Sequence, residues 1–185
     1  QLHEKGLVYE GYKVMPFSAK LGTPLSNFEA SENYKDVDDP AITVSFPIAG
    51  EEDTSLLIWT TTPWTLVSNL AIMAGPDIDY VKVLDNDSKK HFILAESRLP
   101  VYYKDSSGYT IVKRMKGKDL EGTRYVPMFP YFQDRKNSFR VILEPTISLD
   151  EGTGLVHAAP AFGEVDFYAS RRAGAPKVFS PPRAV

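Results

Sequence analysis

Four threonine hydroxyls and two indole rings lie within residues 59–65, which read WTTTPWT. They follow the apolar run 56–58, whose length and composition predict a short buried strand. Pro63 has no amide hydrogen to give to a central strand, so we expect the chain to leave the sheet here. Strand side chains alternate between faces, so at least one threonine must point inward. Its hydroxyl then needs either an internal hydrogen-bond partner or a ligand.

A second stretch, residues 152–167, reads GTGLVHAAPAFGEVDF and combines a glycine turn, a short strand, a proline-interrupted loop and the start of a helix. His157 falls on the expected strand between apolar neighbours, where a lone histidine is commonly a packed core residue. Asp166 falls in the first turn of the expected helix, where the helix dipole favours a carboxylate. Both residues therefore have a structural explanation. Their residue types alone do not show whether they also take part in binding or catalysis.

Together the two stretches resemble the editing domain of isoleucyl-tRNA synthetases of the eukaryotic cytosolic type. This domain is an insertion that hydrolyses wrongly attached amino acids. The runs WTTTPWTL and GTGLVHAAPAFGE carry the resemblance, and segments 7–12, 22–30 and 34–37 resemble the part of those enzymes that leads into the insertion. Valyl and leucyl relatives have an arginine-containing TTRP version of the first motif, whereas Pro63 here follows Thr62 directly.

The resemblance implies a role for each residue of the two motifs. Thr60, Thr61 and Thr62 would line a hydrolytic site, contact the terminal adenosine of the tRNA and position the attacking water. Asp166 would hold the α-ammonium group of the misattached amino acid. His157 would form the wall that meets the amino-acid side chain, and would select by size rather than act as a general base.

The resemblance also marks positions around these residues. Asn69 matches a further polar position of the family and is expected to supply a supporting hydrogen bond, and Gly154 of the second motif is expected in the substrate-binding site. Trp59 and Trp64 have two explanations of equal weight: they face the pocket and stack on adenine, or they pack in the core at a strand end.

The expected reaction is attack of water on the ester carbonyl, helped by the ribose hydroxyl of the substrate. A Ser-His-Asp set or paired carboxylates do not occur near either motif, so a covalent mechanism has no candidate nucleophile. The implied function is hydrolysis of valyl-tRNA made for isoleucine, with valyl adenylate as a further substrate. One methylene gives a synthetic pocket little discrimination, and the isoleucyl enzyme is the standard example of this limit.

Composition bears on the cofactors, location and partners that we expect. Cysteine is absent, and the three histidines are far apart in sequence at positions 3, 91 and 157, so we expect neither a metal nor another cofactor. No apolar stretch approaches membrane-spanning length, and a cytoplasmic location is expected. The net charge of −3 predicts weak RNA binding by the domain alone. The expected partners are the 3′ acceptor end of tRNA(Ile) carrying valine and the rest of the synthetase chain.

The expected fold is mainly β, a closed β-barrel with a few short helices, forming one editing domain over residues 1–185. Residues 1–30 would be its stem, and residues 175–185 its exit segment. Strands are predicted at 43–48, 56–60, 69–73, 80–84, 91–95, 109–115, 123–126, 139–143 and 154–158, from short alternating or apolar runs between turn signals. A helix is predicted over 164–173, with acids in its first turn and arginines in its last.

Two other functions remain open on the sequence. The same fold could edit for a valyl or leucyl enzyme, although the missing arginine after the threonines counts against it. Alternatively, the domain could be a non-catalytic module that only binds the tRNA acceptor end, although its acidic net charge counts against that. A deacylation assay would separate hydrolysis from binding alone.

Overall fold

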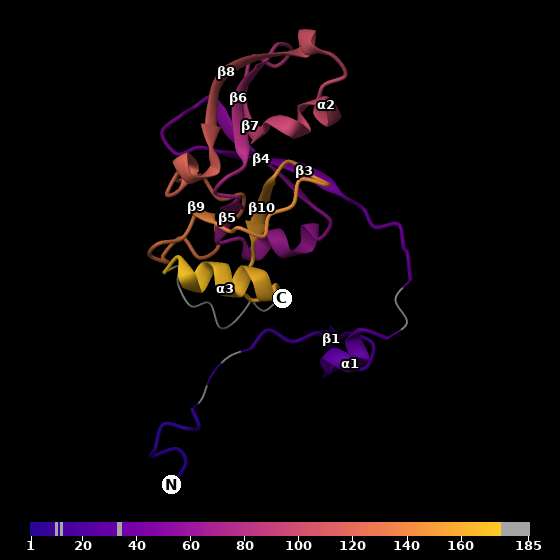
Figure 1. Ribbon diagram of the computed structural model, residues 1–185, viewed down its shortest axis with the longest axis vertical. Coiled ribbons are helices and arrows are strands. Elements are labelled where there is room, and N and C mark those ends of the chain that lie inside the picture. Colours follow the sequence, from indigo (N-terminus) through magenta and orange to yellow (C-terminus); the bar gives the residue numbers. More distant parts are fainter. Residues whose placement is uncertain (10, 12, 33–34, 175–185) are drawn as a thin grey trace. The chain divides into compact units, whose positions relative to one another are not determined.

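The structure, a computed structural model, describes residues 1–9, 11, 13–32 and 35–174 (Figure 1). The predicted exit segment 175–185 lies outside the described residues. The chain divides into two units, Gln1–Val37 and Asp38–Val185. The assignment of residues 1–185 to one domain with a stem over 1–30 stays a prediction.

The first unit contains a two-stranded antiparallel ribbon and one helical turn. Strand β1 (Phe17–Ser18) pairs with β2 (Thr23–Pro24), and α1 spans Asn27–Ala30. The helix begins because Ser26 and Glu29 form a capping box. Ser26 Oγ accepts the Glu29 N–H at 3.2 Å, and Glu29 Oε2 accepts the Ser26 N–H at 2.9 Å. Two amide hydrogens that the helix itself cannot bond are thereby satisfied.

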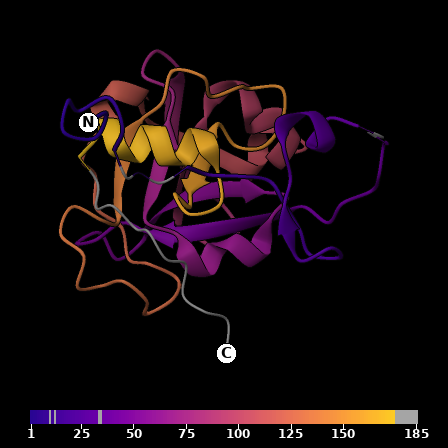
Figure 2. The ribbon, with the colours of Figure 1, turned by 90° about the horizontal axis from the view of Figure 1, so that it is seen from below.

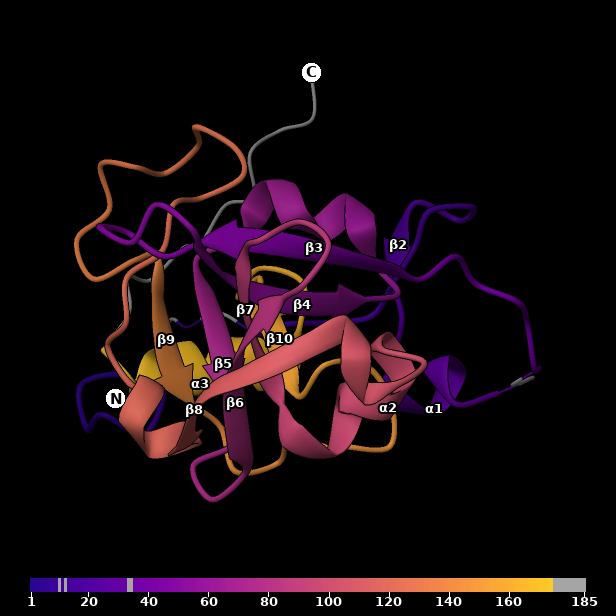
Figure 3. The same cartoon turned by 90° about the horizontal axis from the view of Figure 1, so that it is seen from above.

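The second unit contains two separate sheets (Figure 3). The larger has the strand order β3-β4-β7-β6-β8, with β3 at Ile42–Pro47, β4 at Thr54–Thr60, β6 at Asp79–Asp85, β7 at His91–Ala95 and β8 at Tyr109–Lys116. The smaller has the order β10-β5-β9, with β5 at Ala71–Ala74, β9 at Arg140–Leu143 and β10 at Leu155–Ala158. The β4–β7 and β5–β9 pairs are parallel, and the other pairs are antiparallel.

Short helical segments connect these strands, and α3 follows the last of them. They are η1 (Pro63–Ser68), η2 (Glu96–Arg98), α2 (Leu99–Tyr102), η3 (Ser106–Gly108), η4 (Gly117–Leu120) and α3 (Glu164–Arg172). Pro63 ends the sheet as predicted and also starts η1, because a proline in the first helical turn gives up no hydrogen bond. Pro100 lies in the first turn of α2 for the same reason.

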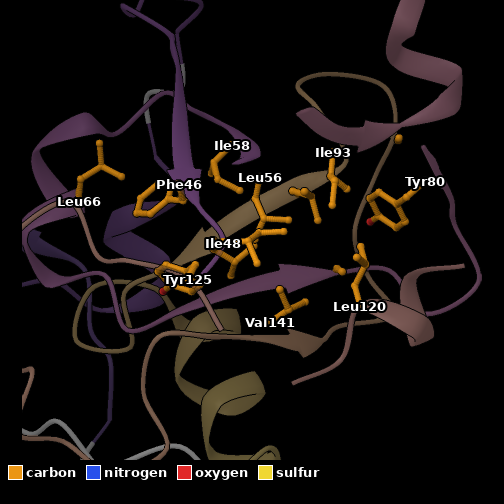
Figure 4. Packing of buried hydrophobic residues seen from close by; sticks show 14 residues of the cluster. Phe46, Ile48, Leu56, Ile58, Leu66, Tyr80, Ile93, Leu120, Tyr125 and Val141 are labelled. Atoms are coloured by element: carbon orange, nitrogen blue, oxygen red, sulfur yellow. The ribbon is translucent and has the colours of Figure 1, made fainter. Parts of the chain in front are cut away.

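Apolar residues form three clusters between successive layers of the second unit. The central cluster lies between the two sheets and includes Phe46, Leu56, Ile72, Tyr125 and Val141 (Figure 4). A second cluster lies between the three-stranded sheet and α3, which crosses the strands in Figure 2. A third lies between the five-stranded sheet and α2. The layers therefore run α3, small sheet, large sheet, α2.

Strand β5 shows how the layers explain the sequence. All four of its residues are buried. Ile72 and Ala74 belong to the central cluster, whereas Ala71 and Met73 belong to the cluster under α3. A strand covered on both faces has no reason to alternate apolar with polar residues, and AIMA is accordingly apolar throughout.

The prediction of a closed barrel is wrong, because neither sheet closes within the described part of the chain. Segment 123–126, predicted as a strand, forms only two isolated bridges, Arg124 to Arg140 and Tyr125 to Ile48. A barrel requires a continuous ladder around its circumference. Strand β4 in addition pairs with β7 only over Thr54–Leu56, so the end of β4 lacks a ladder on that side. The other predicted strands agree with observed ones to within a few residues.

Candidate active site

A cavity of about 480 Å³ opens where β4 and β10 end and where η1 and α3 begin. This volume lies within the range of roughly 300–1,000 Å³ that is typical of sites for small ligands. Both sequence motifs contribute to its wall. The lining residues are Trp59, Thr60, Thr61, Thr62, Trp64, Thr65, Val156, His157, Ala159, Phe162, Gly163 and Asp166.

The three consecutive threonines differ in what their hydroxyls contact. Thr60 Oγ1 is buried and accepts the Thr62 N–H at 3.0 Å, which fixes the turn out of β4. Thr62 Oγ1 lies 3.3 Å from Thr60 Oγ1 and 3.4 Å from Thr65 Oγ1. Thr61 Oγ1 has no such partner among the described residues, and Thr61 is half-buried at the cavity. Its hydroxyl is therefore the one best placed to bond a ligand or a water.

Thr65, the fourth threonine of the run, lies against His157. Its Oγ1 donates to the Thr62 carbonyl at 2.8 Å and lies 3.0 Å from His157 Nε2. A hydroxyl has only one hydrogen, so His157 must donate from Nε2 to Thr65 if both bonds form together. The geometry thus favours the imidazole tautomer with its hydrogen on Nε2 and leaves Nδ1 without a hydrogen.

His157 is neutral under ordinary conditions. Its side chain is buried on β10, and burial lowers its pKa to about 4 because the charged form loses its hydration. Nδ1 is enclosed and has no hydrogen-bond partner within the described residues. A base with so low a pKa is poorly matched to taking a proton at neutral pH. The buried, neutral imidazole is therefore poorly suited to general-base chemistry.

Asp166 supplies the only ionisable carboxylate among the residues that line the cavity. It lies in the first turn of α3, but its Oδ2 accepts the Ala159 N–H at 2.8 Å and so joins the helix to the end of β10. Burial raises the pKa of Asp166, and the bond from Ala159 opposes that rise. Gly163 passes so close that an added Cβ would lie 2.7 Å from the carboxyl carbon, so a side chain there would displace Asp166.

The two indoles have different surroundings. Trp64 is 62% exposed at the edge of the cavity, which leaves its ring face available. Trp59 is half-buried and also lines a second cavity of about 380 Å³ beside segment 148–156. Core packing of Trp64 is therefore excluded by its exposure, whereas Trp59 combines packing with a place at the cavity wall.

Two residues expected at the site lie away from the cavity. Asn69 is buried, donates to the Ala71 carbonyl at 2.9 Å and accepts from Tyr125 Oη at 2.5 Å. Gly154 does not line the main cavity, and its carbonyl accepts from Tyr80 Oη at 2.5 Å. The structure thus gives both residues internal hydrogen bonds that support the strands next to the site.

Five lining residues were not singled out from the sequence: Thr65, Val156, Ala159, Phe162 and Gly163. Thr65 could have been found, because a residue three positions after Thr62 lies beside it if the chain turns helically at Pro63. Phe162, which is 47% exposed, gave no signal beyond its place in the second motif. Its position depends on how the loop after β10 folds back against α3.

Residues 1–146 match the sequence profile of the family described as tRNA synthetases class I (I, L, M and V). The chain belongs to this family. Over 94% of its length it is 63% identical to the isoleucine–tRNA ligase of Protochlamydia amoebophila. Over 90% of its length it is 54% identical to the cytoplasmic isoleucine–tRNA ligase of Saccharomyces cerevisiae. The chain spans only 17% and 16% of the length of these two synthetases, respectively.

The fold agrees with solved editing domains. The editing domain of the Plasmodium knowlesi cytosolic leucyl-tRNA synthetase superposes with a TM-score of 0.56 at 15% identity, over 71% of this chain and 62% of that one. A P. falciparum counterpart with two insertions deleted gives a TM-score of 0.51 at 12% identity, over 67% of this chain and 50% of that one. The predicted resemblance to an isoleucyl-tRNA synthetase editing segment is therefore confirmed. Among the described residues, no helix has the length and apolar character needed to span a membrane.

Proposed function

We propose that the cavity hydrolyses the ester between valine and the 3′ end of tRNA(Ile), within a cytoplasmic isoleucine–tRNA ligase. The observation that carries this proposal is the joining of both motifs around one cavity with a single carboxylate and several fixed hydroxyls. An aminoacyl ester always presents an α-ammonium group, and a partly buried carboxylate is its natural partner. Asp166 is that partner.

The threonines bind and orient the attacking water. Thr60, Thr62 and Thr65 are held by bonds to one another and to the backbone, so they form a rigid wall. Thr61 Oγ1 is left to bond a water or a ribose hydroxyl. A hydroxyl can both donate and accept, so it can orient a water without ionising.

Selection against isoleucine comes from His157, which lies against Thr65. His157 is buried, neutral and bonded to Thr65, so its ring cannot swing aside without losing that bond. A rigid wall resists an extra methylene, whereas a mobile one would admit it. The product of the synthetic site, isoleucyl-tRNA, is thereby spared. Valyl adenylate presents the same ammonium group and side chain, so it fits the same cavity.

The test is deacylation of valyl-tRNA(Ile) by the full-length ligase that contains this segment. We expect the wild-type enzyme to release valine, and Thr61→Val to lower kcat by about 100-fold, on the scale of losing one oriented hydrogen-bond donor at developing charge. Thr110→Val, in β8 away from the cavity, is the matched control and should retain activity. A wild-type enzyme that binds but does not cleave the substrate would instead identify a binding module.

A further inference from the structure

The cavity does not account for a second surface, at the far end of α3, where cations outnumber acids. Segment 124–140 contains four cations and one acid, Asp134, which gives it a net charge of +3 in a chain of net charge −3. Two further arginines, Arg171 and Arg172, end α3. We define the basic surface as Tyr131 together with six cations. The cations are Arg124, Arg135, Lys136, Arg140, Arg171 and Arg172.

Hydrogen bonds hold the two parts of the basic surface together. Arg140 donates from Nη2 to the Ala173 carbonyl at 2.5 Å and from Nε to the Asn137 carbonyl at 3.3 Å. Asn137 Nδ2 donates to the Gly174 carbonyl at 3.4 Å. The loop before β9 therefore lies beside the C-terminal end of α3, as Figure 1 shows.

The cations of this surface are poorly neutralised by the protein. Arg172 pairs with Glu144, and Arg135 lies 4.0 Å from the adjacent Asp134. Within the described residues, Arg124, Lys136 and Arg171 have no carboxylate within 4 Å. Like charges placed directly opposite each other across strands are destabilising. Arg124 and Arg140 are nevertheless bridge partners, so an anion from outside the domain would relieve their repulsion.

Aromatic side chains accompany the charge. Tyr131 is 49% exposed and stacks on Phe129, with ring centroids 6.3 Å apart and an interplanar angle of 20°. Phe132 and Asn137 both have positive φ, at 60° and 63°, a backbone conformation that residues other than glycine rarely adopt. Tyr131 thus presents a half-exposed ring on a basic loop. This combination matches the usual design of single-stranded nucleic-acid sites, which combine cations that follow the backbone with rings on which bases stack.

We propose that the basic surface binds the sugar-phosphate backbone and a base of the single-stranded RNA 3′ end whose terminal aminoacyl group enters the cavity. This inference rests on the proposed function. Asp166 lies in the first turn of α3 and Arg171 in its last turn. Five residue steps separate Asp166 from Arg171, about 7.5 Å along the helix axis, a separation that one or two nucleotides span. The basic surface thus binds the RNA strand, while the cavity binds its aminoacylated 3′ end.

The test compares two triple variants of the full-length ligase. The first is Arg124→Gln, Lys136→Gln and Arg171→Gln, which spares the structural Arg140. Its matched control is Lys90→Gln, Lys104→Gln and Lys113→Gln, which removes the same charge from exposed lysines near the β6–β7 hairpin and along β8. We expect the first variant to raise the KM for valyl-tRNA(Ile) by about 10-fold with kcat unchanged. Its salt dependence, log(kcat/KM) against log[salt], should flatten by about 2, because each lost phosphate contact on a single strand accounts for roughly 0.7.

A small substrate separates the RNA contact from the chemistry. Valyl-adenosine has the ester and the terminal nucleoside but no RNA backbone, so its hydrolysis should be the same in both triple variants and the wild type. Tyr131→Ser should raise the KM for valyl-tRNA(Ile) by roughly 5- to 150-fold, as expected for loss of one base stack, and Tyr131→Phe should not.

Three results would overturn the proposal. An unchanged KM and salt slope in the first triple variant would exclude an RNA contact. Equal loss with valyl-adenosine would show that the variant damages the cavity itself. Impaired deacylation with an unchanged salt slope would indicate that the surface binds an acidic part of the ligase instead. Failure of the wild-type enzyme to cleave either substrate would count against the hydrolytic function and not against RNA binding.

Discussion

Asp166 combines a structural bond with a charge that folding disfavours. Its bond from Ala159 would be kept by any acceptor of the same shape, whereas only a carboxylate can pair with an ammonium group. Because burial raises its pKa, the ionised form reduces folding stability at neutral pH. This reduction disappears as the pH falls below the unfolded pKa, near 4. The charge is therefore kept at a cost in stability, as is common at functional sites.

Asp166→Asn should separate the two roles. The asparagine Oδ1 can still accept the Ala159 N–H, and the neutral amide has no ionisation to disfavour, so the melting temperature should stay equal or rise. Deacylation of valyl-tRNA should lose about 2–5 kcal/mol of transition-state stabilisation, because the substrate ammonium loses its buried partner. Thermal unfolding and kcat/KM check the two halves. Full activity with an unchanged melting curve would show that Asp166 serves only to accept the Ala159 N–H.

His157→Ala should change selectivity more than rate. Removing the ring frees the space that the extra methylene of isoleucine would occupy, and it also releases Thr65. One methylene in an apolar pocket is worth about 1–3 kcal/mol, so discrimination should fall by roughly 10–200-fold.

Deacylation of valyl- and isoleucyl-tRNA by the full-length ligase measures this change, and Thr65→Val shows how much comes from Thr65 alone. Loss of valyl cleavage without any gain of isoleucyl cleavage would indicate a catalytic imidazole.

At the scale of elements, a turn places the second motif. Gly154 precedes β10, has φ of 76° and lies where an added Cβ would be 2.6 Å from Ala95 Cβ. Its carbonyl also accepts from Tyr80, whose pKa burial raises to about 12, so that hydroxyl stays a donor. Gly154 therefore fixes the start of the strand that carries His157.

Gly154→Ala should destabilise the domain by about 2–4 kcal/mol, from left-handed backbone strain together with overpacking. Gly50→Ala is the control, since Gly50 also has positive φ but nothing within 4 Å of the added Cβ. It should lose only the backbone part, about 1–2 kcal/mol. Chemical denaturation of both variants measures the difference, and equal losses would mean that the close approach to Ala95 relaxes freely.

At the scale of the whole second unit, one core joins two sheets that share no continuous ladder. The central cluster takes side chains from both sheets, so neither face can be exposed without exposing the other (Figure 4). Shared burial of this kind makes unfolding cooperative, since small single domains usually unfold in one transition.

Ile72→Ala tests that coupling. Ile72 is fully buried in the smaller sheet, and its truncation should reduce the free energy of unfolding by about 2–5 kcal/mol. Denaturation followed by hydrogen exchange should show amides of β6, in the other sheet, losing protection together with those of β5. Protection lost in β5 alone would show that the two sheets unfold independently.

The sequence by itself predicted most of the strand segments and the exit of the chain from the sheet at Pro63, because these depend on local physics: alternation, proline chemistry and side-chain type. The roles proposed for the two motifs come from the resemblance to the family and stay predictions. Tertiary structure decided what depends on distant contacts. The ladder needed for a barrel fails because Arg124 and Tyr125 form single bridges only. Thr65 meets His157 across 92 residues of sequence, and Asn69 turns to Tyr125 instead of the cavity. No local pattern specifies such pairings, because each depends on how two sheets pack around one core.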